Sequence, residues 1–379
     1  MASITCIDDL QRLARRRVPR MFYDYADSGS WTESTYRANH EELAALRLRQ
    51  RVMVDLSDRS LRREMLGEPC SMPLGLAPVG LAGMQHADGE IHAARAAERF
   101  GVPFTLSTMS ICSIEDVAAH TDRPFWFQLY VMRDRDFTAR LIDRARAAGC
   151  PALVLTADLQ VLGQRHKDIR NGLTVPPKLS VATVANLASK WRWGAGMLRT
   201  RRRTFGNIVG HVREASNLES LSGWVASQFD PALSWDDVRR IRDRWDGKLV
   251  IKGIMDPRDA VEAVDAGADA ILVSNHGGRQ LDGAPAAIRA LPGVVAAVGD
   301  RAEVYMDGGI RSGQDVLKTL ASGARGAFIG RAWVYGLGAM GESGVTSALE
   351  TIRRELDTTL ALCGLRDIDD VDEAILWRD

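Results

Sequence analysis

The chain has 379 residues, and Lys plus Arg equal Asp plus Glu at 49 each, so its formal net charge at pH 7 is zero. A neutral total offers none of the positive field that nucleic-acid-binding proteins use, which argues against nucleic acid as a partner. The length is above that of an average domain but suits one α/β barrel, so we expect a single domain over 1–379.

The cysteines and the first residues bear on the compartment. Five cysteines without a C-x-x-C pair argue against a disulfide framework and a zinc site. His86 and His92 have no third ligand nearby in the sequence, so no metal site is expected. The start of the chain lacks the basic and apolar regions of a signal peptide, and no apolar run approaches the ~18 residues of a membrane span. We therefore expect a cytoplasmic protein.

The N-terminal segment predicts a helix followed by an aromatic cluster. Residues 7–18 place apolar side chains on one helical face, and Pro19 then ends the helix, which we interpret as a lid. Tyr23 and Tyr25 follow ahead of Gly29. Packing accounts for their rings, but two hydroxyl groups so close together also need polar partners. Tyr25 is therefore a candidate site residue.

A regular alternation of strands and helices begins at residue 74. Short apolar runs, too short for helices, predict eight buried strands, and helical patterns lie between most of them. Strand and helix repeated eight times indicate an α/β protein with a parallel (β/α)8 TIM barrel. The predicted strands are 74–78, 103–107, 125–129, 152–157, 248–252, 270–274, 303–307 and 326–330.

Local signals mark the ends of the predicted helices. Ser312 with Asp315 three residues later resembles a capping box, the side-chain arrangement that begins many helices. Gly149, Gly267 and Gly323 each stand where a helical pattern stops and a strand soon starts, as C-cap glycines do.

A long insertion interrupts the alternation after the fourth strand, at about 176–233. Ordinary loops after barrel strands have roughly 2–6 residues, so this segment has a purpose of its own. Its middle, 190–203, combines basic residues and tryptophans and contains no acid. Such a mixture suits an anionic membrane surface, where each cation near the headgroups contributes about 1 kcal/mol. The alternative is a mobile, solvated lid.

Almost all of the residues that end or follow the predicted strands are polar or glycine. In barrel enzymes the active site lies at the carboxyl ends of the strands, so this pattern predicts a site there, although strand ends are in general more polar than their middles. The residues in question are Pro78, Val79, Gly80, Ser107, Gln128, Tyr130, Thr156, Asp158, Lys252, Ser274, His276, Asp307, Gly308, Gly309, Gly330 and Arg331.

The segment 274–282 after the sixth strand has the richest chemistry. His276 can accept a proton near neutral pH, and Arg279 offers a planar fork for a carboxylate. Gly277 and Gly278 let the backbone approach a ligand. Together they suit an anionic substrate that loses a proton, with Asp158 orienting His276. The alternative is a polar loop with a solvated histidine.

The last two strand ends predict a phosphorylated cofactor. They place glycine N–H groups and the guanidinium groups of Arg311 and Arg331 where barrels commonly bind phosphate. Further round, Gln128, Thr156 and Lys252 suit the edge of a planar heterocycle, although a lysine in such a place is often only a structural ion-pair partner. A G-x-G-x-x-G match at 336–341 follows the eighth strand and leaves no room for a dinucleotide-binding domain, so NAD is not expected.

Four features resemble the FMN-dependent L-2-hydroxy acid dehydrogenases and oxidases, which include the glycolate, lactate and mandelate enzymes. They are the segments 274–282, 307–311 and 128–130 and the spacing of Lys252 before His276. The resemblance runs from about residue 5 to about residue 370. It implies that His276 is the catalytic base, supported by Asp158. Arg165 and Arg279 would hold the substrate carboxylate, and Tyr25 and Tyr130 would contact the substrate oxygens.

The same resemblance implies FMN as the cofactor and a set of residues that hold it. The flavin would lie against Pro78, Val79, Gly80, Ser107, Gln128, Thr156, Lys252 and Ser274. The phosphate would lie against Asp307, Gly308, Gly309, Arg311, Gly330 and Arg331.

Two features of the sequence bear on the subtype within this family. Oxygen-using members commonly have alanine where this chain has Gly80, and bacterial membrane-associated dehydrogenases are similar in their basic, Trp-containing insertion. Both favour a quinone-type acceptor and a peripheral position on the cytoplasmic face of the inner membrane. The runs 106–112 and 126–131 resemble those of the respiratory L-lactate enzymes, which favours L-lactate as substrate. Met109 stands where glycolate oxidase has tryptophan, which leaves the pocket size open. The family habit implies a tetramer.

Several alternatives remain from the sequence. Within the family they are an oxidase that uses oxygen and a mandelate dehydrogenase. Outside it they are a flavin-carrying membrane adaptor without turnover, supported only by the basic insertion, and a phosphosugar isomerase on the same barrel, which would be colourless.

Overall fold

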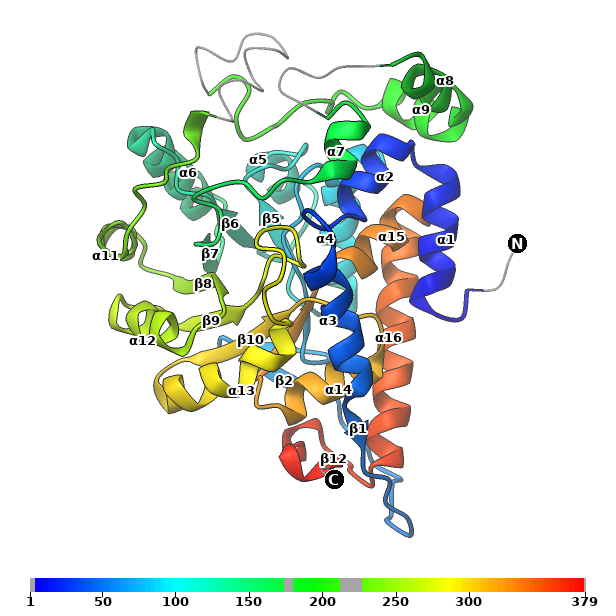
Figure 1. The fold of residues 1–379 in the computed structure, drawn as a ribbon, viewed down its shortest axis with the longest axis vertical. Coiled ribbons are helices and arrows are strands. Elements are labelled where there is room, and N and C mark those ends of the chain that lie inside the picture. Colours follow the sequence, from blue (N-terminus) through cyan, green and yellow to red (C-terminus); the bar gives the residue numbers. More distant parts are fainter. Residues whose placement is uncertain (1–3, 174–179, 212–226, 378–379) are drawn as a thin grey trace.

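A computed structural model describes residues 4–173, 180–211 and 227–377 (Figure 1). An eight-stranded parallel sheet forms its centre, in the order β4-β11-β10-β9-β8-β7-β6-β5. A parallel bridge between Leu76 and Phe104 joins the two ends of this order, so the sheet closes into a barrel. The strands are β4 (Leu74–Leu76), β5 (Thr105–Ser107), β6 (Trp126–Leu129), β7 (Ala152–Thr156), β8 (Lys248–Ile254), β9 (Ala270–Val273), β10 (Glu303–Asp307) and β11 (Gly326–Ile329).

Helices surround the barrel and confirm the predicted (β/α)8 architecture (Figure 1). Each of the eight predicted strands is present at its expected place. The helices that follow strands in the ring are α4 (Gly89–Phe100), α5 (Ile114–Ala118), α6 (Arg135–Ala147), α11 (Trp235–Arg244), α12 (Pro257–Asp265), α13 (Ala287–Val298), α14 (Gly313–Ala321) and α15 (Arg331–Met340), and the long α16 (Glu342–Leu362) packs on α15.

The predicted helix signals have the expected geometry. The Ser312 hydroxyl accepts a hydrogen bond from the N–H of Asp315 at 3.1 Å, and the Asp315 carboxylate accepts one from the N–H of Ser312 at 3.0 Å. Gly149, Gly267 and Gly323 lie one residue beyond the C-cap, with φ of 72°, 96° and 101°. Glycine adopts this left-handed conformation without steric cost, so each helix can end sharply before the next strand.

Two hydrophobic clusters fill the two sides of the strands. The inner cluster lies inside the barrel and contains Val154, Val250 and Phe328. The outer and larger cluster lies between the strands and the helices, with alternate residues such as Leu155 and Ile251. A Cβ atom on Gly75 would lie 2.4 Å from the ring of Phe328, so only glycine leaves room for this ring inside the barrel.

Segments outside the eight strand-helix units lie at the amino end and on the flank of the barrel. At the amino end lies the hairpin of β2 (Arg63–Met65) and β3 (Glu68–Cys70), and β1 (Arg47–Leu48) pairs with β12 (Leu376–Trp377). The predicted N-terminal helix is α1 (Ile7–Arg17), which packs along α15 on the flank of the barrel (Figure 1).

The part of the N-terminal region that reaches the carboxyl end is not α1 itself. It is the segment from the end of α2 (Arg20–Ala26) to the start of α3 (Ser34–Ala45). The N–H of Ser30 donates to the carbonyl of Gly278, and the N–H of Trp31 donates to the carbonyl of Gln164. This segment, 25–36, therefore covers the loops that follow β7 and β9.

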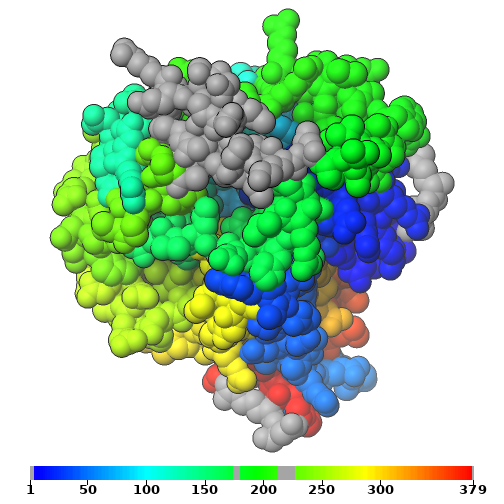
Figure 2. Space-filling model, turned by 45° about the horizontal axis from the view of Figure 1, so that its top comes forward, coloured from blue at the N-terminus to red at the C-terminus, as the bar shows by residue number. Residues whose placement is uncertain are grey.

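The insertion begins after α7 (His166–Arg170) and includes α8 (Val181–Ser189) and α9 (Trp191–Arg199), while 174–179 and 212–226 lie outside the described residues. Figure 2 shows α8 and α9 in green beside the N-terminal helices in blue. The ring of Trp193 stacks on that of Phe22, with 5.5 Å between centroids, which fixes α9 against α2. None of the helices in the described part of the chain is long and apolar enough to cross a bilayer.

The close packing of α15 against α16 explains why the G-x-G-x-x-G match contains glycine at Gly336. A Cβ on Gly336 would lie 2.3 Å from the carbonyl oxygen of Gly344, so the two helices cross at a glycine contact. The motif serves helix packing here.

Candidate active site

A cavity opens at the carboxyl end of the barrel and is lined by residues from the N-terminal segment and from the loops after most strands. It brings together fifteen of the predicted site residues, although they are far apart in the sequence. They are Tyr25, Pro78, Val79, Gly80, Tyr130, Arg165, Lys252, His276, Arg279, Asp307, Gly308, Gly309, Arg311, Gly330 and Arg331. Of the other five, Ser107, Thr156, Asp158 and Ser274 do not line it directly but contact residues that do, and Gln128 bonds to Ser107.

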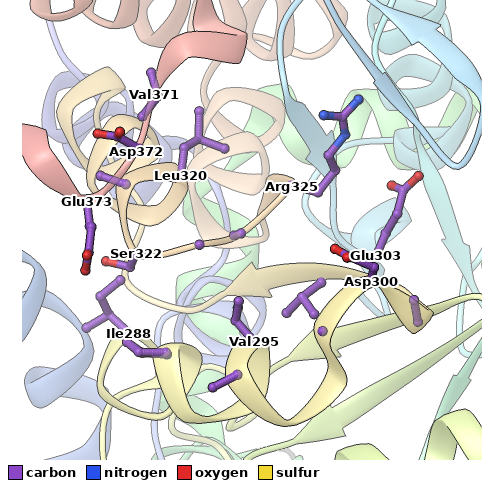
Figure 3. A pocket seen from close by; sticks show the side chains of 18 of the residues that line it. Ile288, Val295, Asp300, Glu303, Leu320, Ser322, Arg325, Val371, Asp372 and Glu373 are labelled. Atoms are coloured by element: carbon purple, nitrogen blue, oxygen red, sulfur yellow. The ribbon is translucent and has the colours of Figure 1, made fainter.

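A larger groove lies at the opposite, amino end of the barrel (Figure 3). Ile288 and Val295 of α13 lie on one side of it and the segment 371–373 on another. None of the predicted site residues lines this groove. Because barrel chemistry depends on the loops at the carboxyl ends of the strands, we assign the active site to the smaller cavity.

His276 and Asp158 form a hydrogen-bonded pair at this cavity. Nδ1 of His276 lies 2.9 Å and 3.2 Å from the two carboxylate oxygens of Asp158. Burial lowers the pKa of His276, and the negative charge of Asp158 offsets part of that effect. Burial acts to raise the pKa of Asp158, but the charges of His276 and Lys252 outweigh it and the net shift is downward. A neutral imidazole beside an ionised carboxylate is the state of a general base ready to accept a proton.

The loop that carries His276 is held by three of its own polar residues, which are not among the predicted site residues. The Gln280 amide donates to the carbonyls of Asp158 (2.6 Å) and Val161 (2.8 Å). The Asn275 amide donates to the Asn39 side chain at 2.9 Å and receives a bond in return.

The third of these residues is Asp282, whose carboxylate accepts bonds from the backbone N–H groups of Thr32 and Thr35. The loop is thus bonded both to the Asp158 loop and to the N-terminal segment. The only sequence signal for the role of Gln280, Asn275 and Asp282 was their position in a motif of mixed polar residues. Their partners are mainly backbone groups of distant loops, which the sequence pattern does not identify.

The backbone of His276 has a left-handed conformation, which we attribute to the hydrogen bonds that hold its loop. Its φ is 56°, which is unusual for a residue with a side chain. Its own N–H donates to the Ser274 hydroxyl at 3.0 Å. The surrounding loop therefore holds the imidazole in a backbone conformation that an isolated chain would rarely adopt.

Two arginines lie at the same cavity. Burial and the nearby charge of Arg165 lower the pKa of Arg279 to about 10, so the Arg279 guanidinium group is still charged at neutral pH. The Arg279 guanidinium lies over the Tyr25 ring at 4.8 Å and donates to the carbonyls of Tyr25 and Ser28. Two neighbouring, partly buried cations repel each other, so an anionic ligand between them would be stabilised.

Apolar side chains form another part of the wall. Tyr130 packs edge-on against Phe229, with 6.1 Å between ring centroids, and burial raises the pKa of its hydroxyl. Met109, Leu159 and Leu162 also line the cavity. This wall suits the side chain of a substrate whose carboxylate lies at the arginines.

Lys252 belongs to a buried polar cluster with Ser274 and Asp307. Its ammonium group donates to the Ser274 hydroxyl at 2.9 Å and lies 3.3 Å from the Asp307 carboxylate. The Ser274 hydroxyl in turn donates to Asp307. Lys252 is thus ion-paired, as the structural alternative supposed, and it also lines the cavity. Asp307 contacts this lysine, so its carboxylate charge is compensated.

Buried polar atoms without partners test whether the site fits FMN. Six buried side-chain polar atoms of the described residues lack a hydrogen-bond partner, and three of them belong to predicted site residues: Gln128 Nε2, Thr156 Oγ1 and Arg311 Nη2. All three belong to residues at or just beyond the carboxyl ends of strands. Such a group costs about 1–3 kcal/mol when it stays unsatisfied, so these atoms point to a ligand. An amide and a hydroxyl suit a polar ring edge, and a guanidinium suits a phosphate; these residues fit FMN.

The glycines predicted to bind phosphate have a backbone geometry that excludes larger residues at one of the two positions. Gly308 and Gly309 have φ of 102° and 84°, and a Cβ on Gly309 would lie 2.2 Å from the carbonyl oxygen of Asn39. Only glycine fits there. Arg331 donates from its three nitrogens to the carbonyls of Ala26, Gly277 and Ser28, so it also ties the N-terminal segment to the His276 loop.

Known proteins resemble the chain over nearly its whole length. The model of the FMN-dependent dehydrogenase family matches residues 14–378. An L-lactate dehydrogenase of Caulobacter vibrioides (strain NA1000 / CB15N) is 47% identical over 374 residues, which cover 98% of this chain and 97% of that protein. An L-lactate dehydrogenase of Pseudomonas aeruginosa (strain PAO1) is 44% identical over 379 residues, 99% of each chain.

Solved structures with the same architecture are similar as well. The crystal structure of a monotopic membrane protein, (S)-mandelate dehydrogenase, superposes with a TM-score of 0.95 at 37% identity and covers 100% of both chains. A mandelate oxidase structure with (S)-2-phenylpropionate has a TM-score of 0.82 at 36% identity and covers 97% of each chain.

Proposed function

The chain belongs to the FMN-dependent dehydrogenase family, and from this premise we propose that it oxidises L-lactate to pyruvate. The family resemblance and the FMN dependence that the sequence implied are thereby confirmed. The observation that best supports the reaction is that one cavity is lined by Arg165, by Arg279 and by His276, which is paired with Asp158. A base beside two carboxylate-binding cations is what the oxidation of a 2-hydroxy acid requires.

In this proposal each side chain has one task. Arg165 and Arg279 bind the substrate carboxylate, and Tyr25 and Tyr130 contact its oxygens. Nε2 of His276 accepts a proton, because Nδ1 already faces Asp158. Asp158 then stabilises the imidazolium ion that forms.

The proposed cofactor residues would bind FMN at two places, the edge of its ring system and its phosphate. Gln128, Thr156 and Lys252 would hold the flavin edge, and Gly309, Arg311 and Arg331 would hold the phosphate. When bound, FMN supplies the acceptor for the two electrons that leave the substrate. Burial of the cavity limits the access of water to the base and the arginines.

The decisive experiment mixes the purified yellow protein with L-lactate in the absence of oxygen. We expect L-lactate to bleach the flavin absorbance and D-lactate to leave it unchanged. His276→Gln, which keeps the size of the side chain but removes the base, should retain FMN and bleach at least about 10²-fold more slowly. Normal bleaching by this variant, or no bleaching of the unaltered protein by any hydroxy acid, would refute the proposal.

A larger L-2-hydroxy acid such as mandelate is the second candidate substrate. The similarity to (S)-mandelate dehydrogenase and the apolar wall with Met109, Leu162 and Phe229 support it. A ratio of kcat/KM for L-lactate over (S)-mandelate above one supports the first proposal, and a ratio below one supports the second.

For the electron acceptor we propose a quinone rather than oxygen. Gly80 supports this proposal through the resemblance, because oxygen-using members commonly have alanine there. Turnover with a soluble quinone analogue should exceed turnover with air-saturated buffer alone, and peroxide release at the full rate would contradict it.

We also propose that α8 and α9 contact the cytoplasmic face of the inner membrane and that the protein forms a tetramer. Val181, Val184, Trp191 and Leu198 on these helices are exposed apolar residues. Arg192 and Arg199 lie exposed on α9. This combination supports binding to anionic lipid. The tetramer is supported only by the habit of the family, and light scattering of the purified protein tests it.

A further inference from the structure

The carboxylate of Asp27, at the end of α2, is a meeting point of four elements. Its Oδ1 accepts hydrogen bonds from the hydroxyls of Tyr36 (3.0 Å) and Tyr335 (2.6 Å). Its Oδ2 accepts bonds from the Tyr23 hydroxyl (2.8 Å) and from Gln11 Nε2 (3.3 Å). The donors belong to α3, α15, α2 and α1. Because each bond is directional, one carboxylate fixes the orientation of side chains from all four helices.

Two of these donors carry an arginine on the face of their ring. The guanidinium carbon of Arg331 lies 4.5 Å from the centroid of the Tyr36 ring. That of Arg311 lies 5.4 Å from the centroid of the Tyr335 ring. A cation is attracted to the face of an aromatic ring, so the orientation of each ring influences where its guanidinium group rests. Asp27 holds the hydroxyl of each of these two rings.

Both arginines line the cavity, and one of them has an unused donor there. Nη2 of Arg311 is buried without a hydrogen-bond partner. Arg331 is anchored by bonds from Nε to the carbonyl of Ala26 (2.9 Å) and from Nη2 to that of Ser28 (2.7 Å), the neighbours of Asp27 on either side. The negative charge of Asp27 also faces these two cations. Burial acts to raise the pKa of Asp27, but the Tyr335 hydroxyl and the charge of Arg331 outweigh it and lower the pKa, so the carboxylate is ionised at neutral pH.

We propose that Asp27 is a positioning residue for the phosphate end of the cofactor site, acting through Tyr36 and Tyr335 on Arg331 and Arg311. Asp27 itself does not line the cavity. Asp27 belongs to the segment 25–36 that covers the cavity. Its contacts with Tyr36 and Tyr335 therefore couple the position of this segment to the binding of phosphate. The inference rests on the proposed function, which assigns the two arginines to the FMN phosphate.

The test compares two flavins that differ only in the phosphate group. Riboflavin has the ring system of FMN without the phosphate, so the ratio of their dissociation constants isolates the contribution of the phosphate end. The full chain, freed of flavin, is titrated with each by the quenching of flavin fluorescence. The unaltered chain should bind FMN more tightly than riboflavin.

In Asp27→Asn and in Tyr335→Phe we expect this preference for FMN to fall about tenfold, with riboflavin affinity unchanged, because each loosens an arginine held by cation–π contact. Tyr23→Phe is the matched control. It removes a hydroxyl from the same carboxylate, but its ring stacks on Tyr335 at 6.3 Å and not on an arginine. Its preference for FMN should stay as in the unaltered chain.

Other outcomes separate a wrong inference from a wrong function. An equal loss of affinity for both flavins in Asp27→Asn, or an unchanged preference, overturns the inference while the function stands. No preference for FMN in the unaltered chain, or a full preference in Arg311→Met, removes the phosphate assignment and the inference with it. If Asp27→Asn cannot be freed of flavin intact, the difference between the Tm increases caused by FMN and by riboflavin in Tyr335→Phe and Tyr23→Phe decides the same question.

Discussion

Nδ1 of His276 lies 2.9 Å from Oδ1 of Asp158, although 118 residues separate the two in the sequence. His276 follows β9 and Asp158 follows β7, so the intervening strand β8 must leave room for their contact. It does so at Gly253, where a Cβ would lie 2.6 Å from the Asp158 carboxyl carbon. A side chain at this position in β8 would push the carboxylate away from the imidazole.

The pH dependence of the reaction should report this pair. A base acts only when neutral, so kcat/KM falls as the pH drops through the pKa of His276. Asp158 raises that pKa against the effect of burial, which lowers it. In Asp158→Asn the acid limb of the kcat/KM profile should therefore move to lower pH, and the plateau should fall by about 10²-fold or more because the imidazolium loses its counter-charge. Movement of the limb to higher pH would contradict this.

Arg279 should control substrate affinity through its planar fork. Arg279→Lys keeps the charge but cannot reproduce two parallel hydrogen bonds to a carboxylate. The loss of a charge-assisted bond predicts a KM for L-lactate that is about tenfold or more higher. FMN content, measured from the visible spectrum, should be unchanged, since this guanidinium lies by Tyr25 rather than at the phosphate end. An unchanged KM would remove Arg279 from the carboxylate site.

Phe229 should limit the size of the substrate. Its ring contacts Tyr130 and lines the cavity, so Phe229→Ala opens space beside the substrate side chain. We expect the ratio of kcat/KM for (S)-mandelate over L-lactate to rise about tenfold, since a filled apolar cavity is worth on the order of 1–3 kcal/mol. Phe229→Leu, which keeps most of the volume, should change the ratio less. Equal ratios in both variants and the unaltered chain would place Phe229 outside the substrate pocket.

The exposed apolar residues of α9 should determine binding to lipid. Trp191 and Leu198 are 69% and 78% exposed. Replacement of both by Ser should weaken co-sedimentation with anionic phospholipid vesicles about tenfold or more.

Leu362→Ser is the matched control for this experiment. Leu362 is 56% exposed and is the last residue of α16, and its carbonyl accepts a bond from the N–H of Arg51, just after β1. β1 lies at the opposite end of the ribbon from α8 and α9 (Figure 1). The control should bind vesicles as the unaltered protein does. Equal binding by the α9 variant and the control would contradict the membrane proposal.

Much of the fold could be predicted because its signals are local. Each strand is an apolar run bounded by polar or glycine residues, and helix ends such as Ser312 with Asp315 depend on neighbours within one turn. The strand ends also predicted which residues share a rim, since parallel strands in a barrel all end on the same side. The covering role of 25–36, rather than of the first helix, was not predictable from these signals.

By itself, then, the sequence determined the barrel, its reactive rim and the family, because apolar periodicity and a motif such as 274–282 are properties of short segments. Only the tertiary structure decided the partners: Gln280 on the carbonyl of Asp158, and Asp27 among the hydroxyls of Tyr36 and Tyr335. A polar side chain can bond to almost any carbonyl or hydroxyl. Which one it meets depends on how distant loops come together when the ring of strands closes.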